Sequence, residues 1–300
     1  MWFRNLQLYR LPPGWAPTVD SLHEQLSRQV FQACGSQDFK SRGWIPPRGD
    51  DRLVFNLERQ WLLALGVEQK LLPASVIRQE AEKRANRLES EQGYRPGRKQ
   101  LRDLREQVTI DLLPRAFSRY QALHCWIDPQ DGWLAIDASS GARAEELLEV
   151  LGKCLDDFPL RRLDTQVSPS AAMAGWLAAG EGPPDFSIDR ECELRLPGAE
   201  KSLVRYVRHP LDGGEIRAHL AAGKEPTRLA MTWQDRISFV LTEKLEVKRL
   251  AFLDVLKEDA EKQSEHGDEI FEIEFALMTG ELRRLLPALV AALGGESKRD

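Results

Sequence analysis

The segment from Pro73 to Arg119 decides the predicted architecture: PASVIRQEAEKRANRLESEQGYRPGRKQLRDLREQVTIDLLPRAFSR. Apolar residues recur at three- and four-residue spacing over 74–92 and again over 98–112, while most other positions are charged. This periodicity predicts two amphipathic helices, and the glycines and proline of 93–97 predict a turn between them. At 1.5 Å per residue, each helix would extend roughly 22 to 28 Å. We therefore expect a helical hairpin that protrudes from the rest of the protein.

Short apolar segments before and after the hairpin predict β-strands separated by turns. Residues 53–57 and 61–67 predict an antiparallel pair, and 122–128 and 132–137 predict a second pair joined at Asp128-Pro-Gln-Asp-Gly132. The opening residues 2–9 predict another strand rather than a signal peptide. Helices are predicted from Thr18 or Asp20 to Gln32 and from Arg143 to Cys154. Strands interspersed in this way with helices predict an α+β fold rather than a βαβ array.

The second half of the chain predicts another α+β region. It has expected helices at 171–179, 215–222 and 279–293, and expected strands at 186–189, 192–196, 202–208, 227–233, 236–241, 247–252 and 269–275. We therefore predict an N-terminal α+β region of residues 1–72 and 120–168, a hairpin of residues 73–119, and a C-terminal α+β region of residues 169–300. The sheets are expected to be mixed or antiparallel.

Charge is unevenly distributed along the 300 residues. The formal net charge is −5, yet Asp254 to Glu274 holds nine acidic side chains and two lysines, so the remainder of the chain is slightly positive. Arg95 to Arg119 holds seven basic and three acidic side chains. Segregated charge creates a local field that can attract an anionic partner. No apolar run approaches the roughly 20 residues that cross a bilayer, so we expect a cytoplasmic protein without membrane contact.

The basic residues of the hairpin and of the C-terminal region are candidates for contacts with DNA phosphates. An alternative interpretation is a solvated helical surface with internal ion pairs. On the strand 202–208, Arg205 and Arg208 should face opposite sides, so only one of them can meet phosphate. The candidate residues are Arg84, Arg87, Arg95, Arg98, Lys99, Arg102, Arg115, Arg119, Lys201, Arg208, His209, Lys224 and Arg228.

Signals for catalysis are few. The chain has no Walker loop, Gly-x-Gly-x-x-Gly, Gly-x-Ser-x-Gly or His-Glu-x-x-His motif. Its four cysteines and five histidines lack the spacing of a zinc site, so we expect no catalytic residue, metal or cofactor. One alternative is a metal-dependent nuclease that uses Asp128, Asp131 and Asp137, although turn formation explains the first two. A second alternative is an interaction scaffold that works through the acidic segment 254–274.

Several strings, in order along almost the whole chain, resemble the RdgC family of recombination-associated proteins. They are Trp2-Phe-Arg-Asn-Leu with Tyr9-Arg-Leu, Cys34-Gly-Ser-Gln-Asp, Gly43-Trp-Ile-Pro-Pro, Leu72-Pro-Ala-Ser-Val-Ile, Leu112-Leu-Pro-Arg-Ala-Phe-Ser-Arg119, Trp126-Ile-Asp, Ala221-Ala-Gly-Lys, Leu229-Ala-Met-Thr-Trp-Gln-Asp-Arg-Ile and Leu277-Met-Thr-Gly-Glu-Leu.

The resemblance implies an open, horseshoe-like monomer and a two-fold homodimer that closes into a ring around double-stranded DNA. It implies binding without sequence preference, association with the nucleoid, modulation of RecA-dependent recombination and replication-fork repair, and no small-molecule substrate. Phe117 corresponds to the aromatic residue at one dimer interface of the family, with a buried core residue as the alternative. The resemblance also implies that Arg208 and His209 correspond to family positions that face the hole, although His209-Pro210 departs from the more polar family pattern.

Overall fold

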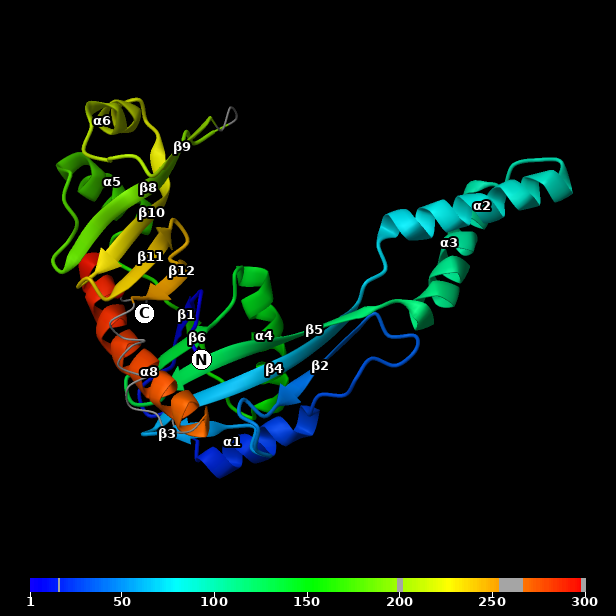
Figure 1. Cartoon of the computed structure of the whole chain (residues 1–300), viewed down its shortest axis with the longest axis horizontal. Coiled ribbons are helices and arrows are strands. Elements are labelled where there is room, and N and C mark those ends of the chain that lie inside the picture. The colour runs from blue at the N-terminus through cyan, green and yellow to red at the C-terminus, as the bar shows by residue number, and fades with distance from the viewer. Residues whose placement is uncertain (16, 199–201, 254–266, 298–300) are drawn as a thin grey trace.

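The protein forms a deep curve with two arms around an open hollow (Figure 1). The structure, a computed structural model, describes residues 1–15, 17–198, 202–253 and 267–297. An N-terminal sheet forms the floor of the curve, a C-terminal sheet forms one arm, and a helical hairpin forms the other (Figure 1). The expected α+β class and open, horseshoe-like monomer are confirmed.

The floor is a seven-stranded sheet in the order β2-β4-β5-β6-β1-β7, with β3 also paired to β4. Helix α1 (Val19–Leu26), the short η1 (Ser27–Gln29) and α4 (Gly141–Cys154) accompany it. Leu22 of α1 and Leu147 of α4 share one apolar cluster with Leu63, so these helices cover one face of the sheet. The strands are β1 (Gln7–Arg10), β2 (Lys40–Ile45), β3 (Phe55–Leu57), β4 (Gln60–Lys70), β5 (Ser118–Asp128), β6 (Trp133–Ile136) and β7 (Arg161–Arg162).

The hairpin arm consists of α2 (Ala74–Gln92) and α3 (Arg98–Leu112), followed by η2 (Leu113–Arg115). The predicted bounds of both helices are confirmed. Gly93 ends α2 in the left-handed conformation at φ 78°, which a residue without a Cβ adopts at little cost. Small buried residues, Ala81 and Ala85, let the two helices approach each other. The arm continues from β4 and returns directly into β5, so the floor sheet fixes its base.

The C-terminal arm is an antiparallel sheet in the order β12-β11-β10-β8-β9. Helices α5 (Pro169–Ala179) and α6 (Gly214–Ala221) lie on its outer side, so its other face is turned toward the hollow (Figure 1). The burial pattern agrees with this arrangement, because Cys192 and Leu194 are buried whereas the alternating residues Glu191 and Glu193 are not. The strands are β8 (Phe186–Arg195), β9 (Leu203–Val207), β10 (Glu225–Trp233), β11 (Ile237–Thr242) and β12 (Val247–Phe252).

Helix α8 (Gly267–Ala292) joins the floor to the C-terminal arm. The predicted strand at 269–275 is wrong, because this segment is the first part of α8. Its β-branched and aromatic residues resemble a strand locally, but Phe271 and Phe275 lie one helical turn apart. Both rings meet Phe55 edge to face, with centroids 5.2 and 5.3 Å away. Tertiary packing therefore decides the conformation of a segment whose local pattern is ambiguous.

Two other predicted bounds are too long. The first strand begins at Gln7 rather than residue 2, because Phe3 turns into the core and the Trp2 indole donates to Glu274 at 2.8 Å. Helix α1 has the predicted cap, since Thr18 Oγ1 accepts from Ser21 N at 3.1 Å, but it ends at Leu26.

The larger apolar cluster combines residues from both sheets and α8, including Phe3, Trp126, Phe239 and Leu282. The three-region division of the chain stays a prediction. Of the acidic segment 254–274, residues 254–266 lie outside the described residues, whereas Glu272 pairs with Arg48. Within the described part of the chain, no helix has both the length and the apolar character to cross a bilayer.

Candidate nucleic-acid interface

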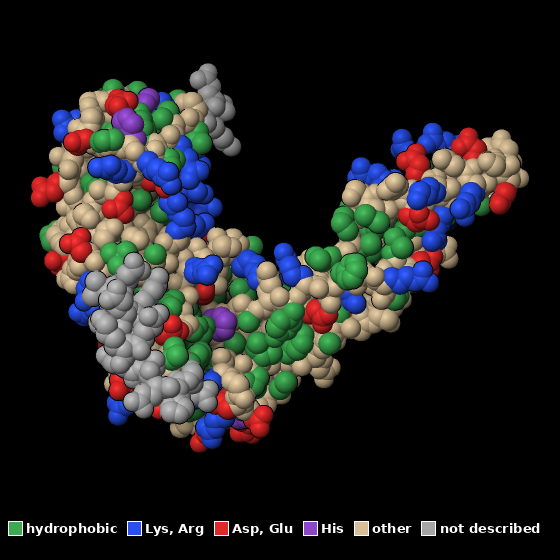
Figure 2. Space-filling model, viewed as in Figure 1, with side chains coloured by type: hydrophobic (Ala, Val, Ile, Leu, Met, Phe, Trp, Pro, Cys, Tyr) green, Lys and Arg blue, Asp and Glu red, His purple; other side chains and the backbone are tan. Residues whose placement is uncertain are grey.

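Lys and Arg side chains gather on the surfaces that face the hollow, from the C-terminal arm across the floor (Figure 2). Acidic side chains are more frequent on the outer surface of the arm in the same view (Figure 2). Because a duplex presents a dense array of phosphates, a concave surface with excess positive charge is suited to hold it.

The floor of the hollow contains a shallow depression lined by Arg4, Arg119 and Arg143. It exists because β6 pairs with β5 only from Cys125 to Asp128, which leaves the edge of β5 nearer the hairpin without that neighbour. Arg119 lies on this edge, Arg143 lies in the first turn of α4, and Arg4 precedes β1. Three segments far apart in the sequence thus bring guanidinium groups to one place.

None of these three arginine side chains forms an ion pair within the described residues. The nearby carboxylate of Asp137 is already engaged, since it accepts from the backbone N–H of Arg4 at 3.2 Å and of Asn5 at 2.9 Å. Burial raises the pKa of Asp137, and these hydrogen bonds partly offset that shift. The floor therefore has three guanidinium groups, and no carboxylate of the described residues lies within ion-pair distance of them.

The exposed face of the C-terminal sheet is also rich in arginine, but its cations are paired. Glu191 binds Arg205 and Arg249, at 2.9 and 2.8 Å. Arg228 lies 4.0 Å from Glu193, and Arg195 lies 2.7 Å from Glu243. The C-terminal arm thus offers arginine hydrogen-bond donors, but neighbouring carboxylates nearly balance their charge. The arginines of the floor lack such ion pairs.

The predicted hairpin residues divide into paired and unpaired groups. Arg84 bridges the two helices through Asp111 at 2.7 Å, Arg95 lies 3.5 Å from Glu82, and Arg102 lies 3.7 Å from Glu106. These contacts agree with the ion-paired interpretation for part of the hairpin. The remaining predicted residues of this region are exposed and form no ion pair with a described residue: Arg87, Arg98, Lys99, Arg115 and Arg119.

The predicted C-terminal residues do not share one surface. Arg228 lies on the face toward the hollow, and Arg208 follows the end of β9 with a left-handed φ of 55°. His209 lies 3.6 Å from Glu215, and Lys224 lies 2.9 Å from the His219 ring, so both are beside α6. Lys201 lies outside the described residues.

An apolar patch lies where the hairpin arm joins the floor. Phe117 is 85% exposed, so the alternative of a buried core residue is wrong. Its backbone carbonyl accepts from Leu71 N at 2.6 Å, which fixes the segment while the ring points into solvent. Other exposed apolar side chains of the same region are Phe39, Leu71, Ile110 and Tyr120. We call these five residues the neck patch.

The three aspartates considered for nuclease chemistry do not form one cluster with free oxygens. Arg283 of α8 binds Asp128 at 2.9 Å and Asp131 at 3.0 Å. Asp128 also accepts from Gln130 N and Asp131 N, as expected for a turn. Asp137 binds the N-terminal segment instead. Across the described ranges, no three His, Cys, Asp or Glu side chains are placed to hold a metal ion.

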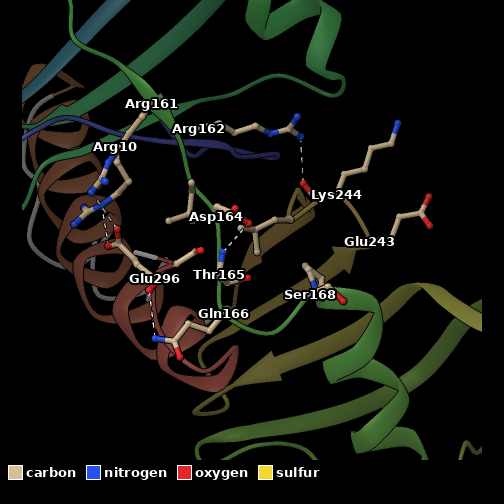
Figure 3. Close-up of a pocket in the computed structure, with 14 residues that line it drawn as sticks. Arg10, Arg161, Arg162, Asp164, Thr165, Gln166, Ser168, Glu243, Lys244 and Glu296 are labelled. Atoms are coloured by element: carbon tan, nitrogen blue, oxygen red, sulfur yellow. Dashed lines mark hydrogen bonds and ion pairs between the residues drawn. The ribbon is translucent and has the colours of Figure 1, made fainter. Parts of the chain in front are cut away.

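A cavity of about 910 Å³ lies at the joint between the two sheets (Figure 3). Glu296 extends between Arg10 and Arg161 there, 2.9 Å and 3.5 Å from their guanidinium nitrogens. Arg10 is further fixed by the Trp133 ring at 4.0 Å. These contacts tie the segment after α8 to strands β1 and β7, so this cavity is best interpreted as a structural joint.

Comparison with known proteins identifies the family. A family model described as "Putative exonuclease, RdgC" matches residues 1–296. The chain belongs to the RdgC family. It is 60% identical over 299 residues to the recombination-associated protein RdgC of Dechloromonas aromatica, which covers 99% of this chain and 98% of that protein. It is 49% identical to the protein of the same name from Janthinobacterium sp., over the full length of both.

The name of these RdgC relatives refers to recombination and is not an enzyme name, whereas the family description refers to an exonuclease. Sequence reasoning did not select Arg4, Arg143 or Arg249 of this RdgC chain, all of which lie near the hollow. Arg4 and Arg143 are isolated arginines in their own segments, and Arg249 adjoins only Lys248, so no extended charge cluster indicates them.

Proposed function

We propose that this protein binds double-stranded DNA without sequence preference, as a homodimeric ring with the duplex in its central hole. The observation that carries the proposal is the group formed by Arg4, Arg119 and Arg143, which lie together on the concave floor without described ion-pair partners. In the cell, the protein would act in the cytoplasm on the nucleoid and modulate RecA-dependent recombination and replication-fork repair.

The physical basis is release of condensed counterions from DNA. Each phosphate that a guanidinium neutralises frees counterions, and this gain does not depend on base sequence. The described structure places no helix across the hollow in the manner of a major-groove reader (Figure 1). Arginines on sheet edges and loop ends therefore support contacts with the phosphate backbone.

Ring closure needs two contacts related by one two-fold axis. The neck patch, of which Phe117 is the most exposed member, is our proposal for the first contact. The exposed edge strand β9 is our proposal for the second, because it ends the C-terminal sheet and exposes Leu203 and Val207. An unpaired edge with apolar side chains is a ready template for pairing with another chain.

The proposal is tested by measuring affinity for several duplexes of equal length and unrelated sequence between about 50 and 200 mM salt. We expect equal affinities at each salt concentration and a steep, parallel fall with salt. Sedimentation of the same samples should give a dimer. Affinity that does not change with salt, or that differs strongly among sequences, would contradict the electrostatic mechanism.

A second candidate, a metal-dependent nuclease, is favoured by the family description alone. Incubation of labelled linear and circular DNA with magnesium or manganese tests it. Degradation that Asp137→Asn abolishes, in a protein with unchanged unfolding temperature, would favour the enzyme. Intact DNA after prolonged incubation would favour binding without catalysis.

A further inference from the structure

Glu191 is the central anion of the sheet face that is turned toward the hollow. One carboxylate oxygen accepts from Arg205 Nη2 at 2.9 Å, and the other pairs with Arg249 Nη2 at 2.8 Å. The Glu191 side chain is 20% exposed, whereas those of Arg205 and Arg249 are 48% and 57% exposed. Both cations are therefore open to solvent while the carboxylate between them is mostly covered.

The strands converge on Glu191 in different ways. Arg205 belongs to the neighbouring strand, where it is opposite Glu193 in the register, so it reaches Glu191 diagonally. Arg249 is at an irregularity of β12, where the register with β11 shifts and its φ is 50°. Such a bulge re-aims a side chain. The next residue, Leu250, donates to the Arg4 carbonyl at 2.8 Å, which connects this cluster to the floor.

The ion pairs of Glu191 with Arg205 and Arg249 form in the free protein, but they are weak enough for DNA phosphates to replace the carboxylate. Burial would raise the pKa of Glu191, but hydrogen bonds from Arg205 and Arg249 outweigh it and keep the pKa below its ordinary value. The carboxylate is thus ionised at neutral pH. Solvent-exposed ion pairs contribute only about 0 to 1 kcal/mol each, so a DNA phosphate can replace a carboxylate as the partner of an exposed guanidinium. A carboxylate left beside the phosphate would then repel it.

We propose that Glu191 sets the DNA affinity of the C-terminal arm by competing with phosphates for Arg205 and Arg249. This inference rests on the proposed duplex-binding function. The floor, whose three arginines form no ion pair with a described residue, would provide the stronger contact, and the C-terminal arm a weaker and exchangeable one. Glu191 is therefore an affinity-lowering residue on the binding face.

The test is the variant Glu191→Gln, which removes the charge and keeps the shape. We expect it to bind a duplex about three- to tenfold more tightly, with a logarithmic salt slope that is steeper by roughly 1 to 2 per protomer. In a background that carries Arg205→Ala and Arg249→Ala, the same substitution should have little effect. This double-mutant cycle isolates competition for the two arginines.

The matched control is Glu149→Gln on α4. Glu149 is also held by two cations, Arg42 at 2.9 Å and Lys153 at 2.6 Å, but it lies beside β2, at the sheet edge away from the hollow. The Glu149→Gln variant should leave DNA affinity unchanged, although it changes the net charge by the same amount as Glu191→Gln. An equal gain in both variants would assign the effect to total charge and overturn the proposal.

Weaker binding by Glu191→Gln would also overturn it, because Glu191 would then position the arginines for DNA. So would unchanged binding in a variant that retains the wild-type unfolding temperature. If the proposed binding surface itself were wrong, the double variant Arg119→Ala with Arg143→Ala would also leave DNA affinity unchanged. Weakened binding in that floor variant, together with no gain in Glu191→Gln, rejects the role of Glu191 alone.

Discussion

Removal of the unpaired floor cations should reduce the salt dependence of DNA binding. The perturbation is the double variant Arg119→Ala with Arg143→Ala. Both side chains line the same depression, and neither is paired with a described carboxylate. Their loss should therefore leave no buried anion uncompensated, and surface substitutions of this kind change the free energy of unfolding by about 0.5 kcal/mol or less.

The magnitude follows from counterion release. Each phosphate contact contributes about 0.9 to the logarithmic salt slope, so a fourfold rise in salt weakens binding roughly 3.5-fold per contact. Two arginines in each of two protomers make four contacts, and their loss should lower the slope by about 3.6. Between 50 and 200 mM salt, the wild-type protein should then lose about 150-fold more affinity than the variant.

Fluorescence anisotropy with a labelled duplex measures these slopes. The control is Arg28→Ala with Arg52→Ala, which removes the same charge from exposed arginines that pair with Asp156 and Asp20 beside α1. Helix α1 lies on the side of the floor away from the hollow (Figure 1). Equal slopes for the floor variant and the control would refute the assignment of the hollow as the binding surface.

Three further outcomes follow from the described contacts. Phe117→Asp should shift the protein from dimer to monomer in sedimentation without altering its far-UV circular dichroism spectrum, because the ring is exposed in the protomer; an unchanged dimer would reject the neck patch as an interface. Burial, with a contribution from the N-terminal amine, lowers the pKa of His124 to about 4, so the unfolded chain gains a proton near pH 6.5 that the folded protein does not. Stability should fall by about 2 kcal/mol between pH 7.5 and 5 in urea unfolding, and this acid sensitivity should be that much smaller in His124→Gln. Arg283→Ala leaves the fully buried Asp128 without its cation and should cost about 3 kcal/mol, and a loss under about 1 kcal/mol in the same assay would contradict that ion pair.

The parts of the fold that local signals specify were predictable from the sequence. The hairpin helices 74–92 and 98–112 have the predicted bounds, because periodicity, a proline start and a glycine stop all act within one segment. The strand expected at 269–275 failed for the opposite reason. Its residues suit either conformation, and contact with Phe55, more than 200 positions away, selects the helix.

The candidate site was less predictable because it is assembled from distant segments. Arg4 and Arg143 meet Arg119 only after β5, α4 and the N-terminus pack together. The choice of Arg208 over Arg205 assumed a regular strand through residue 208, but β9 ends at Val207. The strand alternation therefore no longer separates the two arginines by face. Counting charges along the sequence therefore detects the basic hairpin, but it misses the group of arginines that the fold assembles on the concave floor.

The central claim is that two copies of this chain enclose a duplex, and topological trapping tests it most directly. A dimer loaded on covalently closed circular DNA is cross-linked through a single Phe117→Cys substitution and then washed at about 1 M salt, where the Debye length of about 3 Å screens phosphate contacts. We predict that the cross-linked protein stays on the circle, and that it leaves when a restriction enzyme linearises the DNA. Release of the cross-linked protein from intact circles at the same rate as from linear DNA would contradict enclosure.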